Sequence, residues 1–268
     1  MIYPDYCNQV MLLNKIAARR RLKPYSIGKS VCGRDIRAVD IGSSCRRALI
    51  VGGVHGTEYL TILAALKFAG EYAENPEGMR LTVVPCLNPD GTEIALKNKI
   101  YWQANSNGVD INHNFAAGWN EVKRRELELG ITSPSPSRYG GERPESEPET
   151  KAIVRLCENK CFDRVLALHS QGREIYWDFG KSTPGCCLAL GDEMARVSGY
   201  RVASPEPIAT GGGFKDWFIE RFRRCGFTVE MGIGKNPLPL SDLEAEYPRV
   251  RNILNVFSKA DAKNLGAT

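Results

Sequence analysis

The hydrophobic and polar positions along the chain follow two alternating patterns. Near-continuous apolar runs predict buried strands, because a strand covered on both faces needs apolar residues at successive positions. These runs cover residues 47–54, 81–85, 164–169 and 227–231. Residues 35–42 alternate between apolar and polar and predict a further strand.

Helical periodicity fills most of the intervals between these strands. The predicted helices cover the N-terminal residues up to about 22, then 57–73, 149–158, 187–198, 214–224 and a segment after 241. Strands that alternate with helices indicate an α/β fold with a mixed, mostly parallel sheet covered by helices. Residues 100–146 show little periodicity, which indicates a functional or disordered segment. With no linker or repeat visible, we predict a single domain over 1–268.

Composition and charge narrow the function classes. The 268 residues, 43% hydrophobic and 25% charged, suit one large globular domain. The formal net charge of +5 is scattered, whereas a nucleic-acid binder concentrates positive charge on one face. No apolar stretch reaches bilayer-spanning length and no signal peptide is visible, so we expect a cytoplasmic protein without membrane partners. The odd count of nine cysteines predicts free thiols in a reducing compartment. The oligomeric state is left open.

Candidate chemistry gathers around the three histidines of the chain. His55 and Glu58 follow a buried strand and lie three residues apart, so an imidazole nitrogen and a carboxylate can converge on one cation. Catalytic zinc favours three His or carboxylate ligands and an open fourth position. The alternative is a helix start whose Glu is favoured by the helix dipole. His169, at the end of another buried strand, becomes a candidate third ligand because the first pair lacks one.

Two carboxylates are candidates for supporting roles at such a site. Asp110 is the natural hydrogen-bond partner of a ligating histidine, although Asx-rich turns use the same residue types. Glu230 interrupts an apolar strand, and a buried carboxylate is costly unless it is paired or functional. Burial would raise the pKa of Glu230 toward the range of a general base. The alternative is an ion pair with Arg223 or Arg224.

Six ordered motifs resemble the carboxypeptidase A-like zinc peptidases, over roughly residues 25–240. They are His55-Gly-Thr-Glu58, Asn88-Pro-Asp-Gly91, Gly108-Val-Asp-Ile-Asn112, Ser146-Glu-Pro-Glu149, His169-Ser-Gln171 and Thr228-Val-Glu230. The resemblance implies a mixed sheet of about eight strands with helices on both faces. It also implies one zinc ion per chain, held by His55, Glu58 and His169. Glu230 would then be the general base and acid, and Asp110 would orient His55.

The chain departs from this family at positions that would contact the substrate. Digestive members have Asn-Arg where this chain has Asn112-His113, and His cannot reproduce the paired hydrogen bonds of Arg to a carboxylate. Trp102 is followed by Gln103 instead of Arg, so a neutral amide would stabilise the oxyanion. The flexible tyrosine that covers the substrate terminus in the family has no clear equivalent. These departures argue against ordinary C-terminal trimming.

A branch of the family fits these departures better. The stretches 169–172, 214–218 and 232–239 resemble bacterial γ-D-glutamyl-diamino acid peptidases, which cut between D-Glu and meso-diaminopimelate in peptidoglycan stem peptides. The resemblance implies a peptide or muropeptide substrate. The residues expected to contact it are Asn112, His113, Gln171, Gly212 and Lys215.

Other functions are compatible with parts of this pattern. A carboxypeptidase for ordinary peptides, or a zinc N-deacylase or amidase for small N-acyl amino acids, could use the same metal ligands. A non-catalytic binding module would not need Glu230. A cysteine hydrolase is poorly supported, because no Cys lies beside a plausible His in the chain.

Overall fold

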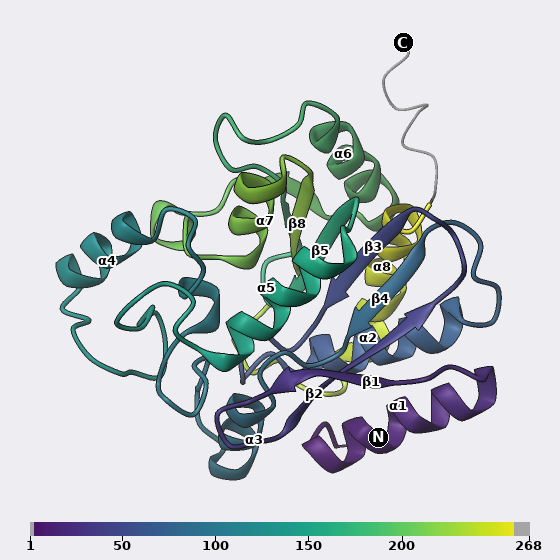
Figure 1. Ribbon diagram of the computed structural model, residues 1–268, viewed down its shortest axis with the longest axis horizontal. Helices are drawn as coiled ribbons and strands as arrows, with labels where there is room; N and C mark the ends of the chain where they lie inside the picture. The colour runs from purple at the N-terminus through teal and green to yellow at the C-terminus, as the bar shows by residue number, and fades with distance from the viewer. Residues whose placement is uncertain (1–2, 260–268) are drawn as a thin grey trace.

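An eight-stranded mixed sheet forms the centre of the protein, in a computed structural model that describes residues 3–259 (Figure 1). The strands follow the order β1-β2-β4-β3-β5-β8-β6-β7. The four central strands, β4, β3, β5 and β8, are parallel, and antiparallel pairs join β2 to β4 and β6 to β8. This arrangement confirms the predicted fold class.

The strands are short, and the helices fill the connections between them. The strands are β1 (Tyr25–Lys29), β2 (Asp35–Ile41), β3 (Arg47–Val51), β4 (Arg80–Val84), β5 (Arg164–His169), β6 (Glu174–Tyr176), β7 (Arg201–Ala203) and β8 (Cys225–Glu230). The α-helices are α1 (Tyr6–Arg20), α2 (Tyr59–Tyr72), α3 (Pro89–Asn98), α4 (Trp119–Glu128), α5 (Pro148–Lys160), α6 (Cys186–Ser198), α7 (Phe214–Phe222) and α8 (Asp242–Phe257). Two 3₁₀ turns are η1 (Ile111–His113) and η2 (Pro207–Ala209). Within residues 3–259, no helix has both the length and the apolar character needed to cross a bilayer.

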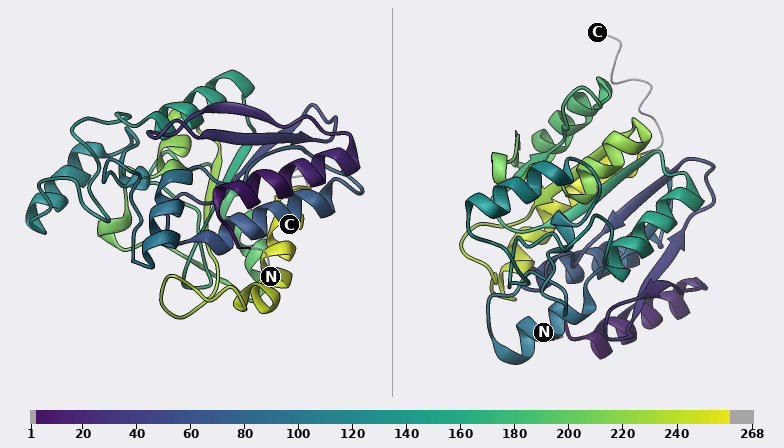
Figure 2. Two further views of the ribbon diagram at one scale, coloured as in Figure 1. Left: turned by 90° about the horizontal axis from the view of Figure 1, so that it is seen from below. Right: turned by 60° about the vertical axis from the view of Figure 1, so that its left-hand side comes forward.

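Helices cover both faces of the sheet and bury two hydrophobic cores (Figure 2). Alternate residues of β3 point to opposite faces, so Ala48 and Ile50 join one core and Leu49 and Val51 the other. The first core packs against α1, α2, α6 and α8, and the second against α5 and α7. The continuous apolar pattern of the central strands reflects this double coverage.

Several elements were not predicted, each for a physical reason. β6 and β7 have three residues each, too few for a pattern, and β1 is a half-exposed edge strand. α4 lies within the segment expected to be irregular, so that expectation was wrong for residues 119–128. Only Val122 and Glu126 of α4 are buried, and the helix projects away from the sheet, so it has no apolar stripe to detect (Figure 1).

The expectation that all cysteines are free was also wrong. Cys187 in α6 and Cys225 at the start of β8 form a disulfide. The two residues are 38 positions apart, and the packing of α6 against β8 brings them together. No local spacing in the sequence could have indicated this pair.

The sheet has a topological switch point at β3. The chain runs from β3 through α2 to β4 on one side, and it later reaches β5 on the other side of β3. In open α/β sheets, ligands bind beyond the carboxyl ends of the strands at such a point. The residues that follow β3 and β5 therefore occupy the expected position for a site.

The start of α3 fastens the loops around this point. Asn88 caps α3 through a hydrogen bond from the Gly91 N–H to its Oδ1 (2.9 Å). Its Nδ2 group donates to the carbonyls of Val54, Gln103 and Ala104, each at 3.1 Å. One buried amide thus joins the end of the β3 segment to the loop that precedes Asp110.

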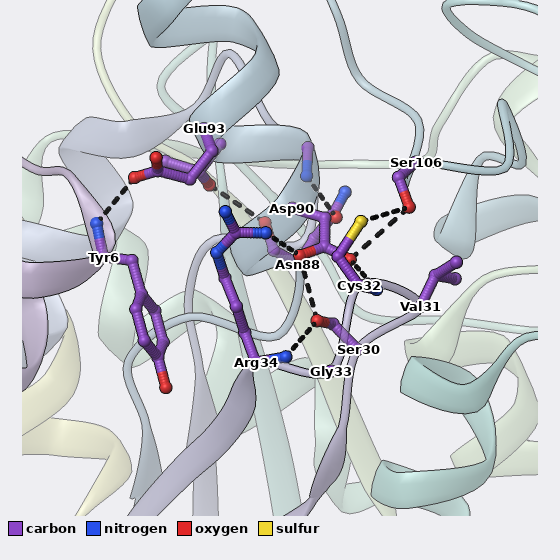
Figure 3. Close-up of polar contacts among 12 residues, drawn as sticks. Tyr6, Ser30, Val31, Cys32, Gly33, Arg34, Asn88, Asp90, Glu93 and Ser106 are labelled. Atoms are coloured by element: carbon purple, nitrogen blue, oxygen red, sulfur yellow. Dashed lines mark hydrogen bonds and ion pairs between the residues drawn. The ribbon is translucent and has the colours of Figure 1, made fainter.

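Asp90, two residues further on, fastens the β1–β2 turn (Figure 3). Its buried carboxylate accepts hydrogen bonds from Ser30 Oγ (2.9 Å), the Cys32 N–H (2.7 Å) and Arg34 Nη1 (2.6 Å). The charge is therefore paired and hydrogen-bonded, as a buried carboxylate requires. The Asn88-Pro-Asp-Gly91 motif is thus explained by structure rather than by chemistry at the site.

Glu149, in the first turn of α5, predicts a pH dependence of stability. The carboxyl is buried, and burial raises its pKa to about 7 although it accepts hydrogen bonds from Val31 and Asn105. The folded protein therefore holds this proton more tightly than the unfolded chain does. Its contribution to the unfolding free energy is complete below the ordinary value near 4.5 and is lost as pH rises through about 7.

We expect Glu149→Gln to remove this contribution. The unfolding free energy is measured with urea at pH 5 and at pH 7.5. Between these pH values, that of the wild type should fall by up to about 3 kcal/mol more than that of the variant. Glu142→Gln, at an exposed position nearby, is the control and should follow the wild type. Parallel pH dependences for wild type and Glu149→Gln would contradict the assignment.

Candidate active site

Two of the expected metal ligands lie in the turn that joins β3 to α2. His55 follows the end of β3, and Glu58 occupies the N-cap position of α2. His55 Nδ1 lies 2.9 Å from Glu58 Oε1. Gly56 allows the turn to press against its neighbours, because a Cβ there would lie 2.3 Å from the Gly91 carbonyl oxygen and 2.6 Å from that of Trp102. The turn that positions both side chains therefore requires glycine.

The third expected ligand reaches the same point from the neighbouring strand. His169 is the last residue of β5, and its Nδ1 lies 3.0 Å from Glu58 Oε2. The rings of His55 and His169 meet edge to face, with centroids 4.7 Å apart. One donor atom from each of the three residues lies within 4.8 Å of the others, and all three side chains are buried.

The arrangement of these donor atoms fits a shared metal ion. Zinc–ligand distances near 2.1 Å in a tetrahedral site separate the donor atoms by roughly 3.4 Å, a few tenths of an ångström more than the contacts of 2.9 and 3.0 Å that Glu58 makes with the two histidines. Glu58 Oε2 is buried and makes no hydrogen bond within residues 3–259, although His169 Nδ1 is near. Two potential metal-ligand atoms that lie close together without hydrogen-bond geometry, as Glu58 Oε2 and His169 Nδ1 do, are expected where both face a common ion.

Asp110 holds His55 in the orientation that a metal ligand needs. Its Oδ1 lies 3.1 Å from His55 Nε2, and its Oδ2 accepts a hydrogen bond from the Arg138 N–H (2.9 Å). A proton on Nε2, donated to Asp110, leaves the lone pair of Nδ1 directed toward Glu58. Asp110 therefore lies within hydrogen-bonding distance of His55, and its role in orienting a metal ligand stays a prediction.

The site concentrates negative charge on two buried carboxylates. Burial alone would raise the pKa of Glu58, but the positive charges of His55 and His169 lower it to about 2. Burial likewise opposes ionisation of Asp110, but His55 and His113 hold the pKa of that carboxyl far below its usual range. The pKa of His55 lies above its ordinary value despite burial, because Glu58 and Asp110 favour its charged form. Two ionised carboxylates beside two imidazoles favour a divalent cation.

Glu230 lies beside the metal ligands at the end of β8. It is the last residue of that strand rather than a mid-strand residue, and in the parallel register it pairs with His169. The side chain keeps some access to solvent, yet burial raises its pKa well above the ordinary value, and the negative charge of Glu58 adds to the shift. The alternative of an ion pair is not observed, because Arg223 and Arg224 donate to backbone carbonyls beyond the other end of β8.

The residues expected to contact substrate fall into two groups. Asn112, His113 and Gly212 come together: Asn112 Oδ1 accepts from the Phe214 N–H (3.1 Å), and a Cβ on Gly212 would lie 2.8 Å from the His113 carbonyl oxygen. Lys215 is buried, and its ammonium contacts Asp216 and the Asp178 carbonyl.

Two further expected residues are Gln103, for the oxyanion, and Gln171, for the substrate. The Gln103 carbonyl accepts from the Gly56 N–H at 3.1 Å, and Gln171 is exposed two residues after His169. The substrate-binding roles of all these residues stay predictions.

Residues missed from the sequence also lie near the site. Tyr101, 48% exposed, has a raised pKa caused by burial and then by the charges of Glu58 and Asp110, which places it close to both. Arg138 is exposed, and the bond from its N–H to Asp110 fixes its backbone beside the site at a φ of 67°. Neither residue belongs to a motif, so no spacing could have indicated it.

A second missed pair borders Glu230 from β6. Glu174 is the antiparallel partner of Glu230, and Tyr176 follows two positions later on the same face of the sheet. Burial raises the pKa of Tyr176, and the charges of Glu174 and Glu230 add to the shift. β6 was too short to predict, so these side chains could not be placed beside the site from the sequence.

Comparison with known proteins agrees with this geometry. The family model for zinc carboxypeptidases matches residues 10–251. The chain belongs to the zinc carboxypeptidase family and is a zinc metallopeptidase, which confirms the predicted class of enzyme. The His–Glu–His group lies within the matched residues.

Two relatives are about one third identical to this chain over the aligned residues. Gamma-D-glutamyl-L-diamino acid endopeptidase 1 of Lysinibacillus sphaericus is 34% identical over 285 residues, covering 91% of this chain and 70% of that protein. Murein peptide amidase A of Escherichia coli K12 is 35% identical over 213 residues, covering 74% of this chain and 77% of its own length. The resemblance to the γ-D-glutamyl-diamino acid peptidase branch is thereby confirmed.

Solved structures confirm the fold. Bovine thrombin-activatable fibrinolysis inhibitor superposes with a TM-score of 0.81 at 21% identity, covering 96% of each chain. Murein-tripeptide amidase from Escherichia coli O157 gives a TM-score of 0.63 at 22% identity, covering 86% of this chain and 90% of that one. At these identities the comparisons speak to the fold alone.

The contact between Asp110 and His55 predicts a loss of metal affinity in Asp110→Asn. The neutral amide is a weaker acceptor for the His55 Nε2–H than the carboxylate is. Zinc affinity should therefore fall roughly 10- to 100-fold in a chelator competition assay. Asp90→Asn is a matched control, since Asp90 is an equally buried carboxylate with several hydrogen bonds and no contact with the ligands. Equal zinc affinity in wild type and Asp110→Asn would show that Asp110 does not orient the ligand.

Proposed function

We propose that this peptidase binds one zinc ion per chain through His55, Glu58 and His169 and hydrolyses the γ-D-Glu–diaminopimelate bond of peptidoglycan stem peptides. The observation that carries the chemistry is the convergence of the three donor side chains, with Glu230 paired to His169 beside them. The substrate is supported by the names of the two relatives, a γ-D-glutamyl-diamino acid endopeptidase and a murein peptide amidase.

Glu230 is suited to move the proton in this reaction. Zinc, when bound, polarises the attacking water and the scissile carbonyl. Glu230 takes a proton from the water and later delivers it to the leaving amine. Its raised pKa brings the carboxylate closer to the range in which one group can serve as both base and acid. Gln103 is proposed to donate a hydrogen bond to the oxygen of the scissile carbonyl.

Recognition of the substrate carboxylates is assigned to residues around η1 and the β5–β6 loop. Asn112, His113 and Gly212 come together beside the start of α7, which carries Lys215, and Gln171 follows His169 by two residues. To these we add Arg138, whose backbone is held against Asp110 and whose side chain is exposed. A guanidinium binds carboxylates through paired hydrogen bonds, which neither His113 nor Gln103 can supply.

The function is tested by metal analysis together with hydrolysis of L-Ala-γ-D-Glu-meso-diaminopimelate before and after chelation. One zinc per chain and chelator-sensitive release of diaminopimelate are expected. Zinc without cleavage of this peptide would overturn the substrate assignment, and assays with C-terminal peptides and N-acyl amino acids would then separate a carboxypeptidase from an N-deacylase. Failure to bind zinc would overturn the metal site itself.

Glu230→Gln separates catalysis from metal binding. The amide cannot take a proton from water, so turnover should fall roughly 10²- to 10⁴-fold while zinc content is retained. Glu220→Gln, at an exposed carboxylate on α7, should keep the wild-type rate. A Glu230→Gln enzyme with near-normal turnover would remove Glu230 from the mechanism.

Arg138→Ala tests recognition of a substrate carboxylate. The loss of a charged hydrogen bond of about 1.5–3 kcal/mol should lower kcat/KM for the tripeptide roughly 10- to 100-fold. A matched control is Arg21→Ala, since Arg21 is also exposed and left-handed (φ 54°) but caps α1. The wild type should discriminate against a substrate amidated at the recognised carboxylate, and Arg138→Ala should not. Unchanged discrimination would contradict the role.

A further inference from the structure

Three cysteines lie close together near the start of β8, whereas the candidate metal ligands lie near its end. Cys187 and Cys225 form the disulfide between α6 and β8, and Cys186 places its Sγ 3.8 Å from the Sγ of Cys225. Cys225 begins β8, whereas Glu230 ends it, so the two groups lie at opposite ends of one strand. The peptidase chemistry makes no use of these sulfur atoms.

The three sulfur atoms differ in their access to solvent. Cys187 is fully buried and Cys225 is 9% exposed, whereas Cys186 is exposed. Exchange requires a thiolate to reach a sulfur atom of the disulfide directly. An external thiol is therefore hindered from attacking the Cys187–Cys225 bond, while Cys186 is accessible from solvent and already close to Cys225.

We propose that Cys186 is a thiol–disulfide exchange site through which small anionic thiols reduce the buried disulfide. The three sulfur atoms lie within 4.8 Å of one another, so the Cys186 side chain first rotates into line with the Cys187–Cys225 bond. The Cys186 thiolate then attacks Cys225 Sγ, a Cys186–Cys225 bond forms, and the Cys187–Cys225 bond breaks. The electron pair leaves on Cys187, which takes a proton from water. This step only moves the disulfide, and no net oxidation or reduction occurs.

The moved disulfide has an exposed sulfur atom, which an external thiol can attack. The thiolate of the external thiol bonds to Cys186 and releases Cys225 as a thiolate. A second thiol then displaces Cys186, forms the external disulfide, and leaves three cysteine thiols in the protein. Two electrons pass from two external thiols to the protein, so the reaction balances with the thiol as the only co-reactant.

The surface around Cys186 favours an anionic thiol. A depression of about 180 Å³ is bordered by Cys186, Cys225 and four arginines, Arg46, Arg164, Arg223 and Arg224. Arg46 is paired with Asp163, whereas Arg223 and Arg224 donate to backbone carbonyls, which leaves their charge uncompensated by these contacts. Burial lowers the pKa of Arg164 to about 10, so it remains charged at neutral pH. Positive charge raises the local concentration of anionic reactants.

A metal site formed by the same three sulfur atoms is the competing interpretation. Thiolate ligands must be deprotonated and unbonded to other sulfur atoms. Since Cys187 and Cys225 are joined to each other, only Cys186 retains a thiol. The arrangement therefore supports exchange rather than metal binding.

The full-length, air-oxidised protein is treated with glutathione. Loss of the Cys187–Cys225 disulfide is followed by alkylation of the released thiols and mass spectrometry. Cys186→Ser should reduce at least about tenfold more slowly than the wild type, because the exposed route is removed. Cys186→Ala is a second variant, and Cys45→Ser, at another exposed free cysteine, is the matched control that should keep the wild-type rate. Circular dichroism verifies that each variant is folded.

A second comparison tests the role of charge. At low ionic strength, glutathione should react faster with the wild type than neutral 2-mercaptoethanol does, after correction for their rates with a model disulfide, and added salt should reduce the difference. Equal reduction rates in wild type, Cys186→Ser and Cys186→Ala would overturn the proposal. Absence of a Cys187–Cys225 disulfide in the oxidised protein would also overturn it.

Discussion

The carboxylate of Glu58, buried between two imidazoles, is the interaction on which the rest of the site depends. It lies 2.9 Å from His55 and 3.0 Å from His169, so it links the turn after β3 to the end of β5. A buried charge of this kind is tolerated only where opposite charge surrounds it. Asp110 extends the same pattern on the far side of His55. The two carboxylates therefore surround the imidazoles with negative charge, and a dication that takes the place of the imidazole protons is the natural centre for them.

The backbone around these charges is held by neutral groups. Gly56 brings the turn into contact with two neighbouring carbonyls, and Asn88 joins three segments through one amide. Precise ligand placement requires such rigid support, since a displacement of about 1 Å is enough to weaken a catalytic site. The same support explains why Gly56 and Asn88, which carry no candidate chemistry themselves, belong to two of the six motifs.

Much of the fold and of the metal site could be predicted, because both depend on local signals. The buried strands are continuous apolar runs. His55 comes four residues after the end of β3, and His169 is the last residue of β5. What could not be predicted depends on packing between distant segments or on very short elements. β6 is too short for a pattern, and the pairing of Cys187 with Cys225 is created only when α6 docks on β8. Arg138 lies in a loop that is held by hydrogen bonds to distant segments, among them the bond from its N–H to Asp110 and the bond from the Asp110 N–H to the Tyr139 carbonyl.

The order of the ligands along the chain has a consequence for how the protein is made. His55 and Glu58 lie near the first third of the sequence, whereas His169 follows more than a hundred residues later. Contacts of such long sequence separation form slowly, because the intervening loop must be closed before they are gained. During synthesis from the N-terminus, β3 and the first two ligands emerge long before β5 does. Complete assembly of the His–Glu–His group is therefore a late event in the folding of the chain, reached only after the centre of the sheet has closed.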